Sequence, residues 1–79
     1  MTNSKKLTLF CKNVRFLRKH HNLSQKEMAK RLHIGVYSFK KIENDIIPPR
    51  LGVDILFYFY PNFSISPEQI LSADLSKNI

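Results

Sequence analysis

The sequence lacks the residues that would cross-link a small chain or hold a structural metal. Cys11 is the only cysteine among 79 residues, so no intramolecular disulfide can form. The three histidines do not combine with it at any usual zinc spacing. A chain of this size buries only about 60% of the surface that its unfolded form exposes. We therefore expect a small apolar core that contains the thiol, with no metal and no cofactor.

Long apolar runs and the common catalytic motifs are missing as well. The longest apolar run, Ile55 to Tyr60, is too short to span a bilayer, and the first residues lack the apolar stretch of a signal peptide. No carboxylate pair, Ser/His/Asp set, metal cluster or glycine-rich phosphate loop is present. We expect a soluble, cytoplasmic protein that is not an enzyme, contacts no membrane and needs no small-molecule ligand.

Acidic residues are scarce in the first half of the chain. Residues 1–42 hold eleven lysines and arginines but one acid, Glu27, whereas residues 43–79 hold two basic and five acidic residues. The net charge of +7 thus combines a strongly basic half with a mildly acidic one. A surface that only has to be soluble does not need this segregation. The pattern favours a polyanionic partner that faces one side of the domain.

Strand patterns and hairpin turns are weak, while helix patterns are frequent. Leu7, Phe10, Val14 and Leu17 recur at the three- and four-residue spacing of one helical face. They predict a single all-α domain over residues 1–79, with its core at about 7–72 and with frayed termini that include the last six residues. Similar patterns and the breaks between them predict five helices, over about residues 7–21, 25–32, 36–43, 51–59 and 67–71.

Several helix ends are marked by their residue types. Ser24 and Glu27 have the spacing of a capping box, in which each side chain bonds the backbone N–H of the other residue. Asn22 tolerates the left-handed conformation that often ends a helix. Pro61 is expected to end the fourth helix, and Ser66 lies directly before a proline and an acid, as at a helix start. These signals fix where the expected helices begin and end.

The second and third expected helices are joined by a short break at His33–Gly35, which is typical of a helix-turn-helix. The chain resembles the phage-repressor/Cro-type (XRE-like) helix-turn-helix family over roughly residues 10–72. This resemblance implies a five-helix bundle of the lambda-repressor-like kind with a central helix-turn-helix. The residues that carry it are Arg15, Arg18, the block Leu23-Ser24-Gln25-Lys26-Glu27-Met28-Ala29, Leu32, Phe39, Ile42, Glu43 and the pair Ile70-Leu71.

The resemblance also implies roles for individual residues. Arg18 and Glu43 would form a mostly buried ion pair between the first and third helices. The third helix would lie in the major groove of DNA. Its base-facing residues would be Val36, Tyr37, Ser38, Lys40 and Lys41. The phosphate contacts would come from Ser24, Gln25, Asn44 and Arg50.

The chain departs from the family pattern at four positions. His33 stands where the family usually has glycine, and Gly35 stands where it usually has the serine or threonine that caps the third helix. Asp45 and Ile47 replace a glycine and a basic residue after the third helix. We expect Asp45 to put negative charge, and Ile47 an apolar side chain, where a DNA phosphate would lie. Either the loop follows another path there, or DNA binding is weakened.

The aromatic segment near the fourth expected helix holds more apolar residues than one face can bury. Val53, Phe57 and Tyr60 follow helical spacing on the side opposite the core residues. An exposed patch of this kind usually marks an interface. We expect a symmetric homodimer through these residues and Phe63. The alternative is that Phe57 and Tyr60 pack beneath the C-terminal tail.

The charge distribution, the helix-turn-helix pattern and the departures from it are compatible with two functional classes. The first is a repressor-like transcriptional regulator that binds a palindromic operator in double-stranded DNA as a homodimer. The second is a helix-turn-helix module used for protein contact, such as an antitoxin-like protein or a regulatory adaptor. Asp45 and Ile47 favour the second class, whereas the basic first half of the chain favours the first.

Overall fold

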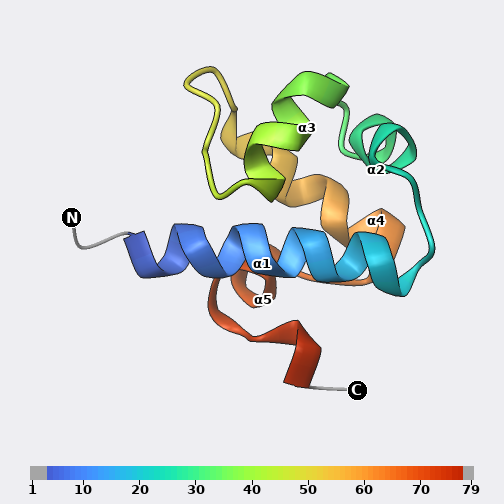
Figure 1. The fold of residues 1–79 in the computed structure, drawn as a ribbon. Coiled ribbons are helices and arrows are strands. Elements are labelled where there is room, and N and C mark those ends of the chain that lie inside the picture. Colours follow the sequence, from blue (N-terminus) through green and yellow to red (C-terminus); the bar gives the residue numbers. More distant parts are fainter. Residues whose placement is uncertain (1–3, 78–79) are drawn as a thin grey trace.

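The computed structural model describes residues 4–77, which form five α-helices and two 3-10 helices and contain no strand (Figure 1). The all-helical expectation is therefore confirmed for this part of the chain. The expected domain also includes residues 1–3 and 78–79, which lie outside the described residues. In chain order the elements are α1 (Ser4–His20), α2 (Gln25–Arg31), α3 (Val36–Glu43), η1 (Val53–Tyr58), α4 (Phe59–Phe63), α5 (Pro67–Ser72) and η2 (Leu75–Lys77).

The longest helix, α1, runs through the middle of the molecule. Figure 1 shows α2 and α3 on one side of it, and α5 with η2 on the other. α1 contacts α3 on the first side and both α5 and η2 on the second. The helix-turn-helix is thus mounted on one side of α1, while the C-terminal elements cover the opposite side.

The core lies where these elements meet. Phe10 of α1 and Phe59 of α4 pack edge to face, with ring centroids 5.9 Å apart and an interplanar angle of 84°. Edge-to-face packing brings the positive ring edge against the negative ring face and adds to the gain from burial. Both helices of the helix-turn-helix contribute side chains to this core. The other buried apolar residues are Cys11, Val14, Leu17, Met28, Ala29, Leu32, Phe39, Ile42, Ile55, Ile70 and Leu75.

Two helix starts are closed by capping boxes. The Glu27 N–H donates to Ser24 Oγ at 3.0 Å, and the Ser24 N–H donates to Glu27 Oε1 at 2.8 Å. Ser66 and Gln69 make the same two bonds at 3.2 and 2.9 Å. The caps expected at Ser24 and Ser66 are therefore confirmed, with Gln69 as a partner that the sequence analysis did not name. Both boxes satisfy N–H groups that a helix start leaves unpaired.

Four helices end at a left-handed residue that is not glycine. The positive φ angles are 56° at Asn22, 60° at His33, 64° at Asp45 and 59° at Ser64, and neither glycine has one. After α3 the Asp45 N–H donates to the Ile42 carbonyl at 3.0 Å, and the Ile46 N–H donates to the Lys41 carbonyl at 2.8 Å. This pair of bonds is the Schellman motif. The expected left-handed cap at Asn22 is confirmed.

The expected helix over residues 51–59 is wrong. Residues 53–58 form η1, and α4 follows directly with Pro61 inside it, so Pro61 does not end the helix. Gly52 precedes η1 without a side-chain cap. Pro61 is tolerated because it lies in the first turn of α4, where an N–H has no helical partner. α4 ends instead at left-handed Ser64.

Both ends of the described range are helical. α1 starts at Ser4, earlier than expected, and Leu75 near the other end is 7% exposed. The side chain of Asn13 in α1 bonds the backbone of the C-terminal segment at Ile70, Ala73 and Leu75. The sequence analysis did not single out this asparagine. It attaches the C-terminal segment to α1.

Candidate nucleic-acid interface

α2 and α3 form the helix-turn-helix, and close packing sets how they meet. Ala29 of α2 is 2% exposed, and Phe39 and Ile42 of α3 have no exposed surface. The turn between the helices passes through left-handed His33 to Gly35, which caps α3 without a side-chain bond. The apolar side of each helix is thus buried, and the opposite side of α3 faces outward.

The outward face of α3 carries an aromatic ring and two lysines. Tyr37 is 80% exposed, and Lys40 and Lys41 are also exposed. Lys40 Nζ lies 5.8 Å from the centroid of the Tyr37 ring, within the range of a cation–π contact. Val36 and Ser38 are half-buried, and Val36 packs against the core. Of the five residues expected to face bases, three are therefore fully on the open face.

The ion pair expected between Arg18 and Glu43 is present. Arg18 Nε donates to Glu43 Oε2 at 2.5 Å, and its Nη2 donates to Oε1 at 3.2 Å. The side chains are 17% and 8% exposed, so water screens the pair weakly. Arg18 Nη1 also donates to the Leu23 carbonyl at 3.1 Å. The pair joins α1 to the end of α3 and to the segment that leads into α2.

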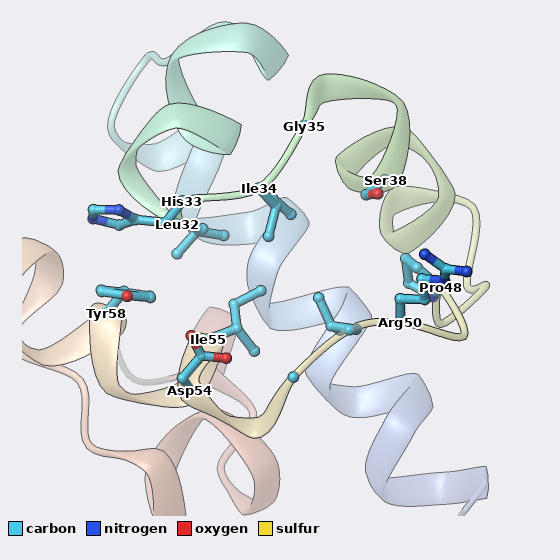
Figure 2. A pocket seen from close by; sticks show the side chains of 12 residues that line it. Leu32, His33, Ile34, Gly35, Ser38, Pro48, Arg50, Asp54, Ile55 and Tyr58 are labelled. Carbon is cyan, nitrogen blue, oxygen red and sulfur yellow. The ribbon is translucent and has the colours of Figure 1, made fainter.

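Three of the four residues expected to contact phosphates make hydrogen bonds within the protein, Ser24 through its capping box with Glu27. Gln25 Nε2 donates to Glu43 Oε1 at 2.8 Å, so this amide belongs to the Arg18–Glu43 ion pair. Asn44 Nδ2 donates to the Lys40 carbonyl at 3.1 Å at the end of α3. Ser24 is exposed at the start of α2, where free N–H groups favour an anion. Arg50 is exposed and lines a cavity together with Ser38 (Figure 2).

The loop after α3 differs from the sequence-based expectation at one of its two unusual residues. Ile47 is half-buried and packs against the core, so it does not present an apolar side chain to solvent. This fits the alternative in which the loop follows another path, because the chain turns inward at Ile47 toward Leu7 and Leu51. Asp45 is exposed, and its Oδ1 lies 3.6 Å from Arg15 Nη1. Arg15 Nη1, which no sequence signal placed here, also donates to the Glu43 carbonyl at 2.5 Å, so its ion pair with exposed Asp45 is the weaker contact.

The residues expected at a dimer interface are largely open to solvent. Val53, Phe57 and Tyr60 are 77%, 64% and 65% exposed. The alternative, in which Phe57 and Tyr60 pack beneath the C-terminal tail, is wrong for the described part of the chain. Phe63 is half-buried, and its ring centroid lies 4.9 Å from that of His21. We call the three open side chains of Val53, Phe57 and Tyr60 the η1–α4 apolar surface.

A ring stack that the sequence analysis missed supports the turn of the helix-turn-helix. The rings of His33 and Tyr58 lie 4.1 Å apart between centroids, with an interplanar angle of 22° (Figure 2). His33 belongs to the turn before α3, and Tyr58 is the last residue of η1. The stack thus connects the helix-turn-helix to the segment that carries the η1–α4 apolar surface. Because His33 and Tyr58 lie far apart in the sequence, no local sequence pattern predicts this stack.

Other kinds of site are absent from residues 4–77 in two respects. In that range no group of three histidine, cysteine, aspartate or glutamate side chains is arranged to hold a metal ion. None of the helices described there is long and apolar enough to cross a membrane.

Comparison with known proteins gives one match. Residues 11–71 match a family model described as a helix-turn-helix domain, which covers more than half of the chain. No curated protein and no solved structure gives a significant match. The matched range begins within α1, contains α2 and α3, and ends within α5.

Proposed function

The chain belongs to the helix-turn-helix domain family, and from this we propose that it is a repressor-like transcriptional regulator that recognises a specific sequence in double-stranded DNA through α3. The observation that carries the proposal is the outward face of α3. Tyr37, Lys40 and Lys41 are exposed there, and neither lysine has an acidic partner among residues 4–77. The protein acts by binding and not by catalysis.

Base recognition comes from the exposed side chains of α3. Lys41 donates to the O6 and N7 acceptors of guanine in the major groove. Tyr37 contributes its ring and its hydroxyl, and the nearby Lys40 ammonium adds positive charge to the same face. Val36 contacts a thymine methyl group, and Ser38 bonds at the edge of the contact. This assignment rests on the resemblance to phage-repressor/Cro-type proteins, which is more specific than membership of the helix-turn-helix domain family.

Backbone phosphates are held on both sides of α3. On one side Ser24 and the first N–H groups of α2 bind an anion. The side-chain amide nitrogens of Gln25 and Asn44 each carry two N–H groups. One N–H bonds within the protein, to Glu43 and to the Lys40 carbonyl respectively, and the other binds a phosphate. Arg50 binds the backbone on the other side of α3. Because these contacts go to phosphates and not to base edges, they supply affinity without reading sequence.

Two copies of the chain bind a palindromic operator. The η1–α4 apolar surface supports this proposal, because its three large apolar side chains are more than half exposed and exposed apolar side chains are available for an interface. Binding to such an operator requires the two α3 helices to lie about 34 Å apart, one turn of DNA. We place this activity in the cytoplasm, where a chain with a single thiol stays reduced.

Selection of duplexes from a random library, followed by fluorescence anisotropy at several salt concentrations, tests DNA binding. We expect a palindromic site whose affinity falls steeply with salt, because phosphate contacts release counterions. Lys41→Ala should weaken binding to that site by about tenfold. Lys77→Ala is the matched control, since Lys77 is exposed in η2 on the side of α1 away from α3 (Figure 1). Failure to select a site would contradict the proposal and favour a protein partner.

Analytical ultracentrifugation tests the dimer. Phe57→Ser should shift the protein from dimer to monomer, and it should leave the helical content unchanged because Phe57 is exposed. Ile46→Ser removes another exposed apolar side chain, 53% exposed, outside the η1–α4 apolar surface and should leave the dimer intact. A monomeric wild-type protein at micromolar concentration would contradict this part of the proposal.

A further inference from the structure

A cavity of about 270 Å³ lies between the helix-turn-helix and η1. Its walls come from four segments: the turn before α3, the first half of α3, the loop at residues 48–52, and η1. Figure 2 shows the His33–Tyr58 ring stack at one end of the cavity and Arg50 beside α3 at the other. Binding sites for drug-sized molecules start at about 300 Å³, so this cavity suits a molecule slightly smaller than those.

Two opposite charges line the cavity without protein partners. Neither Arg50 nor Asp54 forms a hydrogen bond or ion pair with any residue between 4 and 77. Figure 2 shows Arg50 on the α3 side and Asp54 on the η1 side, with the apolar side chains of Ile34 and Ile55 between them. Gly52 leaves the space that the carboxylate occupies, since a Cβ there would come 2.5 Å from Asp54 Oδ1.

We propose that this cavity binds a small zwitterion of dipeptide size, whose carboxylate pairs with Arg50 and whose ammonium pairs with Asp54. An anion alone would meet the Asp54 carboxylate, and a cation alone would meet the Arg50 guanidinium. A zwitterion with separated charges is attracted at both ends, and its apolar middle covers Ile34 and Ile55. The sequence predicted no small-molecule ligand, because these residues come from segments that only the fold brings together.

Occupancy of the cavity competes with DNA, a consequence that rests on the proposed function. Arg50 is the residue proposed to hold a phosphate beside α3, and Ser38 lines the same cavity. A ligand carboxylate on Arg50 neutralises the guanidinium that the phosphate would use. The zwitterion therefore acts as an effector that weakens DNA binding.

Titration of the isotope-labelled protein with glycyl-leucine, followed by two-dimensional NMR, tests the site without DNA. We expect saturable shifts of the backbone amide signals of Ile34, Gly35 and Gly52, which line the cavity. Two derivatives of glycyl-leucine serve as controls: the N-acetylated dipeptide lacks the ammonium, and the dipeptide with a C-terminal amide lacks the carboxylate. Each should bind about tenfold more weakly, as expected for loss of a charged hydrogen bond.

Protein variants assign the two charges. Asp54→Asn should weaken glycyl-leucine binding by about tenfold and make the protein indifferent to N-acetylation of the dipeptide. Arg50→Gln should also weaken glycyl-leucine binding by about tenfold, and it should make the protein indifferent to amidation of the dipeptide carboxylate. Both side chains are exposed, so both variants should fold. Unsaturable or absent shifts at millimolar dipeptide, or equal binding of the acetylated and free forms, would overturn the proposal.

A competition experiment separates this site from the proposed DNA binding. Glycyl-leucine should lower the DNA affinity of the wild-type protein, and Asp54→Asn should bind DNA normally but respond less to the dipeptide. If glycyl-leucine binds in the NMR titration and no DNA site can be selected, the site stands and the proposed function fails. If a DNA site is selected and glycyl-leucine does not bind, the proposed function stands and the cavity site fails.

Discussion

The N–H of Leu75 donates a hydrogen bond of 3.0 Å to the side-chain oxygen of Asn13, which has no exposed surface. The same amide donates from its nitrogen to the carbonyls of Ile70 and Ala73, at 3.0 and 2.7 Å. Three backbone groups at the end of the chain are thus paired by one buried side chain of α1. Buried polar groups of this kind cost free energy whenever a partner is removed.

Asn13→Leu should lower the free energy of unfolding by about 3 kcal/mol, because it leaves two carbonyls and one N–H without partners. Urea denaturation measures this loss. Asn44→Ala is the matched control, since its exposed amide bonds one carbonyl that water can reach, and it should change stability little. Equal effects of the two substitutions would mean that Asn13 is not what attaches the C-terminal segment.

Arg18→Met should also destabilise the fold by about 3 kcal/mol, because the nearly buried Glu43 carboxylate loses its counter-charge. The double variant Arg18→Met/Glu43→Leu should recover much of that loss, since no charge then remains buried. Lys12→Met breaks the more exposed ion pair with Asp74 and should have a much smaller effect. Urea denaturation of these variants tests the claim, which fails if the double variant is no more stable than Arg18→Met.

Asp45→Asn should raise affinity for the selected DNA site by about threefold at low salt, because it removes a negative charge near the phosphates. Asparagine tolerates the left-handed backbone of this position, where φ is 64°. Asp45→Gly should give the same gain in affinity and change stability by less than about 1 kcal/mol. Salt-dependent anisotropy checks both variants, and unchanged affinity would place Asp45 away from the DNA.

Stability should fall between pH 9 and pH 11 through the thiol of Cys11. Burial, followed by the nearby Asp45 carboxylate, raises the pKa of this thiol from 9.0 to about 11. In that window the unfolded chain releases a proton that the folded chain keeps, so the unfolding free energy decreases with pH by about 2 kcal/mol. Chemical denaturation of the wild type and of Cys11→Ala across this range measures the difference. Parallel pH profiles for the two proteins would rule out the contribution of the thiol.

The features predicted correctly from sequence are those that neighbouring residues encode. The Ser24 and Ser66 caps, the left-handed Asn22 and the bounds of the third helix depend on contacts within a few positions. The family resemblance added one distant contact, the Arg18–Glu43 ion pair. The DNA-facing roles of the α3 residues stay predictions.

The errors involve contacts between segments far apart in sequence. Nothing near Gln25 shows that its amide bonds Glu43, and nothing near Ile47 shows that its side chain turns toward Leu51. The fourth helix was wrong because an apolar spacing was taken for an α-helix, whereas residues 53–58 form a 3-10 helix. The cavity with its unpaired Arg50 and Asp54 had no sequence signal of any kind.

The bonds from Asn13 to the C-terminal segment also set the order in which the molecule can mature. They join residues 57, 60 and 62 positions apart. A ribosome that has released α1 to α3 has not yet synthesised the partners that Asn13 needs. Residues 70–75 must therefore leave the exit tunnel before Asn13 can make these bonds and hold α1 on this side. Proteolytic loss of Leu75 would remove one of the three bonds and loosen the contact between α1 and the C-terminal segment.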